Sequence, residues 1–315
     1  MAKKNNNSEK IDSIKERKRY TGNGIRAIHI NWTLPFRYRN PGQKYTIPDY
    51  EVLSTALSAF LWRLLNGSIK LYTDAQGLEF YSQCDMLGLW DGGVDYQVLS
   101  SIEPQHINPE IFWAAGKLFA IQNEKKPFVM MDTDLMVWRN LADSEYIYNR
   151  RLMALHREPL ANNDYYLPLY LLKKRSDYTP NPKWDWSEDP CNTALAYFND
   201  TDFLNRYTSA AIDFMTDNNE RPMEMVTQMV FAEQRIFSMV AKESNIPIGT
   251  FLDNPDQENG ITHIWGAKAE AQNDPTKLNS LCKELSWAIF INFPEYRQMP
   301  YLRGVMKKYC PPAGL

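Results

Sequence analysis

Short strand-like segments alternate with helix-like segments along the first half of the chain. Strands are expected at residues 24–32, 68–74, 94–100 and 128–131, and helices at residues 48–67, 78–81 and 109–122, with Asp49 as an N-cap and Gly67 as a helix end. Strands that are joined by helices need crossover connections, which place neighbouring strands parallel to one another. The sequence therefore predicts an α/β fold with a mainly parallel central sheet flanked by helices.

The apolar run 128–131 ends directly on two acidic residues, Asp132 and Asp134. A strand in the middle of a parallel sheet is covered on both faces, so it reads as continuous apolar sequence. Open α/β sheets bind ligands just beyond the carboxyl ends of such strands. Residues i and i+2 of an extended chain point to the same side, so the two carboxylates can converge while Thr133 faces away.

This pair of aspartates predicts a divalent metal site. Two converging carboxylates repel each other unless a cation lies between them, and Mg²⁺ and Mn²⁺ prefer oxygen ligands. The alternative is that Asp132 and Asp134 are ordinary loop acids that cap the following turn.

The segment 261–268, with the sequence ITHIWGAK, offers partners for such a site. His263 lies on a short expected strand, and Lys268 follows a glycine-containing turn. The segment could therefore supply an imidazole ligand and an ammonium group that neutralises phosphate. The alternative is a partly buried structural histidine.

Residues 223–242 have the apolar periodicity of a helix, and Glu233 falls inside the apolar stripe. A carboxylate there needs a compensating partner. It could bind a sugar hydroxyl or stabilise charge in a cleft. It could equally be a residue at the edge of the stripe that is paired with a basic neighbour.

Trp184 and Trp186 occur in a loop rich in proline and aspartate, before an expected strand at residues 193–198. Both look exposed, and flat apolar side chains beside acids suit the mixed faces of a sugar ring. The alternative is ordinary packing beneath a long loop.

Composition predicts a folded protein of enzyme size. The chain has 315 residues, 44% of them hydrophobic, and a net charge of −3. Residues 1–19 carry seven basic and three acidic side chains, so the remainder is acidic, which argues against broad nucleic-acid binding. Residues 1–20 are expected to form a disordered basic tail, with peripheral binding to the inner membrane face or to a partner as the alternative.

The chain is expected to be cytoplasmic, because its first residues have no apolar signal-peptide core and its most apolar segment is short and interrupted by Arg63. Its four cysteines are far apart and have no CxxC spacing. Neither a zinc site nor redox chemistry is indicated.

Five segments occur in an order that resembles a known family. They are LYTD, KPFVMMDTDLMVW with its preceding helix, CNTALAYFN, AEQRIFS and THIWGAK, and the resemblance covers residues 24–268. This order resembles GT-A fold glycosyltransferases, closest to the glycogenin-like and lipopolysaccharide-galactosyltransferase-like group (family eight). It is also similar to the DxD-containing capsular-polysaccharide sugar transferases. The resemblance implies a GT-A domain at residues 21–275, with a helical C-terminal extension at residues 276–315 that packs on the same domain.

The resemblance assigns metal binding to Asp132, Asp134 and His263, with Mn²⁺ or Mg²⁺ as the ion. Lys268 matches the basic residue that contacts the donor diphosphate, although the spacing HxxGxK is one residue shorter than the commonest form. The resemblance implies a nucleoside-diphosphate sugar as donor, with UDP as the nucleotide, and a glycan or glycolipid as acceptor.

Other positions match residues that contact the donor. Lys117 resembles the basic residue before the DxD strand, Asp74 a nucleotide-side residue and Asn192 a sugar-contacting asparagine, although Cys191 and Ala194 replace the usual aromatic residue and glycine. Glu233 and Gln234 resemble the acid and glutamine that hold the donor sugar and support the reaction centre, which implies that these two residues are catalytic.

The resemblance to family eight implies a hexosyltransferase-like enzyme of polysaccharide biosynthesis that retains the anomeric configuration. Two alternatives stay open. A haloacid-dehalogenase-like phosphatase would use Asp132 as its nucleophile, although that motif usually opens its domain. A catalytically silent GT-A-like protein would bind a nucleotide sugar without turnover.

Overall fold

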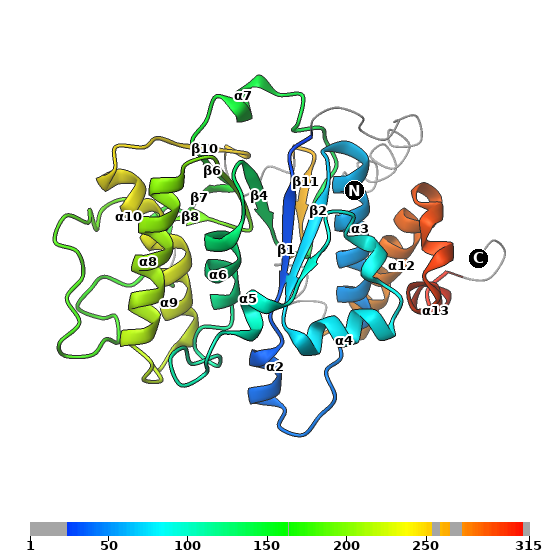
Figure 1. Ribbon diagram of the computed structural model, residues 1–315, viewed down its shortest axis with the longest axis horizontal. Coiled ribbons are helices and arrows are strands. Elements are labelled where there is room, and N and C mark those ends of the chain that lie inside the picture. The colour runs from blue at the N-terminus through cyan, green and yellow to red at the C-terminus, as the bar shows by residue number, and fades with distance from the viewer. Residues whose placement is uncertain (1–23, 163, 254–258, 265–272, 311–315) are drawn as a thin grey trace.

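The computed structural model describes residues 24–310 apart from residues 163, 254–258 and 265–272. A seven-stranded sheet runs through its centre in the order β10-β6-β9-β4-β1-β2-β3. Helices lie on both sides of this sheet (Figure 1). The predicted fold class is confirmed: it is an α/β fold with a mostly parallel central sheet flanked by helices.

The strands of the central sheet are short, and among those described β9 alone runs antiparallel to its neighbours β4 and β6. Their bounds are β1 Ala27–Asn31, β2 Ile69–Thr73, β3 Val94–Asp95, β4 Phe128–Met131, β6 Leu152–Ala154, β9 Leu195–Phe198 and β10 Ile248–Thr250. Two antiparallel pairs lie outside this sheet: β5 Leu135–Val137 with β11 Ile261–His263, and β7 His156–Arg157 with β8 Cys191–Asn192.

The helices form two layers. One layer contains α3 Asp49–Leu65, α12 Pro275–Asn292, η4 Pro294–Gln298 and α13 Pro300–Lys307, and the other contains α6 Ala115–Asn123, α8 Thr201–Asp217, α9 Met225–Val230, η3 Phe231–Arg235 and α10 Ile236–Glu243 (Figure 1). Shorter helical segments connect these elements: α2 Leu34–Arg39, α4 Ala75–Gln83, η1 Leu87–Leu89, α5 Gln97–Ser100, α7 Glu145–Tyr148 and η2 Leu160–Asn162.

Strand β4 shows why its sequence is apolar throughout. Val129 and Met131 belong to the core on the α3 side, whereas Phe128 and Met130 belong to the core on the α8 side. Alternate residues of a strand point to opposite faces, and both faces of β4 are covered by helices. All four side chains are therefore buried.

The C-terminal helices pack on α3. Phe293, just after α12, stacks on Phe60 of α3 with ring centroids 5.2 Å apart. Lys308 and Tyr309, after α13, both contact the carboxylate of Asp49 at the start of α3. Asp49 is the first residue of α3, and the N-cap position predicted for it is taken by Pro48.

Two predicted elements are wrong in extent. The strand expected at residues 94–100 is a strand only at Val94–Asp95, because Asp95 Oδ1 accepts hydrogen bonds from the backbone N–H groups of Gln97 and Val98 and so starts the helical turn α5. The helix expected from residue 109 begins only at Ala115.

The predicted disordered tail, residues 1–20, lies outside the described residues. Among the helices that the structure describes, none has the length and apolar character needed to cross a membrane.

Candidate functional site

The candidate site lies where several strand ends meet at one edge of the sheet. Strand β1 is parallel to both β2 and β4, so the carboxyl ends of all three strands share this edge. Antiparallel β9 begins there, because its residue Leu195 pairs with Met131. Asp132 continues the pairing, since its N–H donates to the carbonyl oxygen of Ala194 at 2.8 Å.

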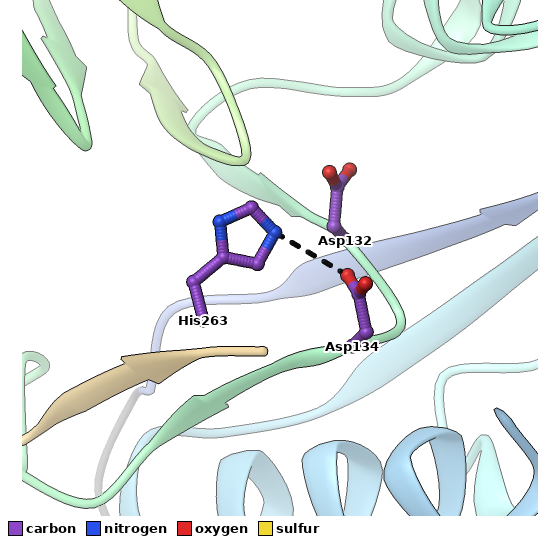
Figure 2. Close-up of side chains that lie close together, drawn as sticks. All are labelled: Asp132, Asp134 and His263. Carbon is purple, nitrogen blue, oxygen red and sulfur yellow. Dashed lines mark ion pairs between the residues drawn. The ribbon is translucent and has the colours of Figure 1, made fainter. Parts of the chain in front are cut away.

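Asp132, Asp134 and His263 converge at this edge (Figure 2). One potential ligand atom from each lies within 4.8 Å of the others. The two aspartates come from the turn between β4 and β5. His263 reaches them because β11 pairs antiparallel with β5 and places His263 opposite Leu135, the residue after Asp134.

The donor atoms of this cluster fit a divalent cation. His263 Nε2 lies 3.4 Å from Asp134 Oδ1, yet this nitrogen is buried and has no hydrogen-bond partner among the described residues. A buried polar atom without a partner is costly. Carboxylates are the ligands that Mn²⁺ and Mg²⁺ prefer, and an imidazole is a common metal ligand in proteins.

Lys117, near the start of α6, bridges two acids of the site. Its Nζ lies 2.7 Å from Asp132 Oδ1 and 2.8 Å from Glu233 Oε1. Burial would lower the pKa of Lys117, but the two carboxylates outweigh this effect and raise its pKa above the usual value. Lys117 is therefore charged throughout the physiological pH range.

Several effects shift the pKa of the Asp132 carboxyl group in opposite directions. Burial raises the pKa of its carboxyl group, Lys117 lowers it, and the neighbouring carboxylates of Asp134 and Glu233 raise it again, with a net upward shift. The raised pKa therefore reflects burial of the carboxyl group first and the neighbouring acids second.

Glu233 enters the site from a π-helical turn. The predicted helix 223–242 is built from α9, the π-turn η3 and α10 in direct succession, and Glu233 lies in the middle of η3. Glu233 is buried, and its Oε1 accepts a hydrogen bond from Thr193 Oγ1 at 2.9 Å beside the Lys117 ammonium. Such π-turns interrupt regular helices frequently at functional sites. The basic partner expected for this carboxylate is present, and a sugar contact stays a prediction.

Gln234 and Asn192 flank Glu233. Tyr166 donates a hydrogen bond to the side-chain oxygen of Gln234. Asn192 precedes Thr193, and its Nδ2 donates to Glu158 Oε1 at 3.2 Å. The two residues adjoin Glu233 and Thr193 in the chain, but these hydrogen bonds go to Tyr166 and Glu158, and contacts of the amides with a sugar stay predictions.

Asp74 follows β2 at the same edge, but its oxygens already accept several hydrogen bonds. Its carboxylate accepts from Gly77 N at 3.0 Å, which caps α4, and from both N and Oγ1 of Thr33 at 2.8–2.9 Å. The structure thus gives Asp74 a structural task, whereas its nucleotide contact stays a prediction. Lys268, the predicted diphosphate ligand, lies outside the described residues.

The two tryptophans that look exposed in the sequence are packed instead. Trp184 is buried, and Trp186 stacks on Phe231 of η3 with ring centroids 5.5 Å apart. Arg235 holds the backbone of this loop by donating to the carbonyl oxygens of Leu167 and Trp186. The expectation of an exposed sugar platform is therefore wrong, and the alternative of packing beneath a long loop is correct.

Sequence reasoning did not identify Thr193 as a site residue. Its hydroxyl binds Glu233, and its side chain is almost fully buried. A threonine just before a buried strand is unremarkable in sequence, so no local signal distinguishes it.

The fold and site together define an α/β protein with a strand-end cluster of two aspartates and a histidine. The chain matches a family of unknown function (DUF6734) over residues 35–299 and belongs to that family. No curated protein sequence matches it.

Several solved structures share parts of its architecture at low identity. GlyE of Streptococcus pneumoniae, a glycosyltransferase, is 13% identical with a TM-score of 0.41, and the match covers 82% of this chain and 50% of GlyE. WbbM, a bifunctional glycosyltransferase, is 9% identical with a TM-score of 0.42, covering 93% of this chain and 53% of WbbM. Mouse xyloside xylosyltransferase 1 is 8% identical with a TM-score of 0.35, covering 72% of this chain and 84% of that chain.

This chain spans about half the length of the GlyE and WbbM chains. Likeness at this level concerns general architecture only. It does not test the resemblance to family eight.

Proposed function

We propose that this protein is a metal-dependent glycosyltransferase. It would move a sugar from a nucleoside-diphosphate sugar, with UDP as the favoured nucleotide, to a glycan or glycolipid acceptor. The observation that carries this proposal is the convergence of Asp132, Asp134 and His263, with a buried imidazole nitrogen that lacks a hydrogen-bond partner among the described residues.

Charge balance supports a divalent cation at this place. The carboxylates of Asp132 and Glu233 share the ammonium group of Lys117, and the carboxylate of Asp134 lies close enough to Asp132 to raise its pKa. A divalent cation between Asp132 and Asp134 would relieve the repulsion between their carboxylates. Asp132, Asp134 and His263 would hold Mn²⁺ or Mg²⁺, and the ion would act as a Lewis acid for the charge that develops on the departing diphosphate.

The side chains of Lys117 and Glu233 would organise the sugar end of the site. Lys117 holds the Glu233 carboxylate at 2.8 Å, and Thr193 fixes the same oxygen from the other side. A carboxylate held in this way can accept a hydrogen bond from a sugar hydroxyl and stabilise positive charge at the anomeric carbon. Gln234, already bound to Tyr166, would support the same region, and we propose that the reaction retains the anomeric configuration.

Metal-dependent nucleotide binding tests this function directly. Thermal unfolding is measured with UDP, GDP, CMP and dTDP, each with Mn²⁺ and with EDTA. A nucleotide at about 100 times its Kd should stabilise the fold by about 2.7 kcal/mol. We expect UDP with Mn²⁺ to give the largest shift, and equal shifts with Mn²⁺ and EDTA for every nucleotide would contradict the metal site.

Turnover separates this proposal from its alternatives. Incubation with UDP-sugars and Mn²⁺ should release UDP, and hydrolysis of a simple phosphate ester should not occur. Ester hydrolysis that Asp132→Asn abolishes, without any response to sugar nucleotides, would favour the phosphatase. Nucleotide-sugar binding without turnover for any donor would favour a binding protein.

A further inference from the structure

A buried chain of hydrogen bonds leads from the core to the backbone beside the candidate metal ligands. Ser58 Oγ, on α3, donates to the carbonyl oxygen of Leu135 at 2.6 Å. His29 Nε2, on β1, lies 3.1 Å from Ser58 Oγ, and Trp90 Nε1 lies 3.3 Å from His29 Nδ1. His29 and Ser58 have no exposed surface, so solvent does not share these contacts.

The direction of each hydrogen bond follows from the chemistry of the donors. The indole N–H of Trp90 can only donate, so His29 Nδ1 accepts. Burial lowers the pKa of His29 to about 3, against an opposing influence of Asp134, so the ring is neutral near pH 7 and carries its single proton on Nε2. His29 then donates to Ser58 Oγ, which leaves the Ser58 proton for the carbonyl of Leu135.

The carbonyl of Leu135 needs this partner because of its place in the antiparallel strand pair β5–β11. Ile264 N donates to Asp134 O, and the next pair in the register is Leu135 with His263. Pairs alternate in an antiparallel ladder, so Leu135 and His263 are a non-hydrogen-bonded pair whose carbonyl groups point away from the partner strand. A buried carbonyl in this position must find its donor elsewhere, and Ser58 provides it.

We propose that Ser58, oriented by His29 and Trp90, is a positioning residue for the metal site. Leu135 follows Asp134 in the chain and is paired with His263 on the neighbouring strand β11. By holding the Leu135 carbonyl, Ser58 fixes the position of the turn that carries both Asp132 and Asp134. The inference rests on the metal site of the proposed function, and it assigns to Ser58 no contact with metal or substrate.

Two serine substitutions on the same helix test this role. Ser58→Ala removes the hydroxyl group that holds Leu135. Ser54→Ala is the matched control, because Ser54 is also buried on α3 but donates to Glu51 O, within the first turn of the same helix, at 3.2 Å. Mn²⁺ affinity is measured by electron paramagnetic resonance without nucleotide, at a temperature where both variants are folded.

We expect Ser58→Ala to raise the Kd for Mn²⁺ about 10-fold, the size typical when an outer partner of a metal ligand is lost, and to change the spectrum of bound Mn²⁺. Ser54→Ala should leave both unchanged. Equal Mn²⁺ affinities of the two variants and the wild type would overturn the positioning role and leave the metal site standing. Failure of the wild type to bind Mn²⁺ would overturn both.

A tryptophan pair provides a second test should Ser58→Ala fail to fold. Trp90→Phe removes the donor that orients His29, so it should weaken Mn²⁺ binding by a smaller factor than Ser58→Ala. Trp62→Phe is its control, because Trp62, on α3, is also buried but donates to Ile25 O and not to a residue of the β5–β11 strand pair. Equal Mn²⁺ affinities of these two variants would contradict the chain from Trp90 to Leu135.

Discussion

The carboxyl ends of β2 and β4 both carry aspartate, but the two strand ends use it in opposite ways. Asp74, after β2, accepts hydrogen bonds from Thr33 and Gly77, all of them from neutral donors. Asp132 and Asp134, after β4, lie close to each other and to an imidazole nitrogen that has no hydrogen bond among the described residues.

The difference teaches that a strand-end aspartate is not by itself a ligand. At β2 the carboxylate completes a helix N-terminus, so its task is stability. At β4 the carboxylates of Asp132 and Glu233 share the ammonium group of Lys117, and burial and the neighbouring acids raise the pKa of Asp132 against the influence of Lys117, so the charged form of Asp132 is disfavoured. A costly charge cluster on a rigid strand end is what a cation site requires.

The largest effect is expected from Asp134→Asn, which tests the β4 end. The amide lacks the charge that attracts the cation, so the Kd for Mn²⁺ should rise at least about 100-fold. Thermal stability without metal should not fall, because one of several clustered negative charges is removed. Titration calorimetry with Mn²⁺ and a melting curve in EDTA measure the two quantities.

Asp143→Asn is the control, because Asp143 is an exposed acid after β5 that pairs with Asn140. Unchanged Mn²⁺ affinity in Asp134→Asn would show that the β4 end, like the β2 end, is structural.

The next effect concerns Glu233, the acid that Lys117 joins to the β4 end. Glu233→Gln should leave the affinity for Mn²⁺ and UDP nearly unchanged and lower kcat with the intact donor by roughly 100-fold, because its proposed partner is charge that develops on the sugar in the transition state. Initial rates at saturating donor check this expectation.

Glu243→Gln is the matched control. Glu243 is the last residue of α10, the helix that follows η3, and it pairs with Arg206. Equal losses of kcat in the two variants would indicate a loss of structure and not a role in the reaction.

Asp74→Ala tests the β2 end. It should lower the free energy of unfolding by about 2 kcal/mol, because both a helix cap and the bonds to Thr33 are lost. Asp274→Ala, which removes a plain N-cap from α12, should cost about 1 kcal/mol. Urea unfolding measures both values.

The affinity of Asp74→Ala for UDP with Mn²⁺ decides the nucleotide contact predicted for this residue. An affinity like that of the wild type would restrict Asp74 to the cap, and a marked loss of affinity with little loss of stability would make the two strand ends functionally alike.

The smallest effect concerns the neutral ring of His29 beneath the β4 end. Its folded pKa of about 3, lowered by burial, lies below the unfolded value near 6.5, so the unfolded chain binds the proton more readily. The stability from this group is complete above pH 6.5 and is lost as the pH falls towards 3. Between pH 7 and pH 5.5 the loss should be about 1 kcal/mol.

His29→Gln cannot take up this proton, so its unfolding free energy in EDTA should fall by about 1 kcal/mol less than that of the wild type over the same pH interval. Identical pH profiles would contradict a buried neutral histidine.

Local patterns in the sequence were sufficient for strands β1, β2, β4 and β9 of the sheet and for part of the site, whereas β6 and β10 were not predicted. The four apolar residues of β4 predicted a strand covered on both faces, and the core residues confirm it. The sequence failed at Asp95, where short-range hydrogen bonds turn an expected strand into α5, and at Trp184, which the tertiary fold buries in the hydrophobic core on the α8 side.

The sequence alone determined that Asp132 and Asp134 follow a buried strand, because strand period and apolar character are local properties. Only the tertiary structure decided which other groups join them. The register of β11 on β5 brings His263 to Asp134, and the π-turn brings Glu233 to Lys117. These contacts connect residues that are distant in the chain, so they depend on how whole elements pack. The bonds from Thr33 to Asp74 are also long-range, whereas the cap that Asp74 forms on α4 is local.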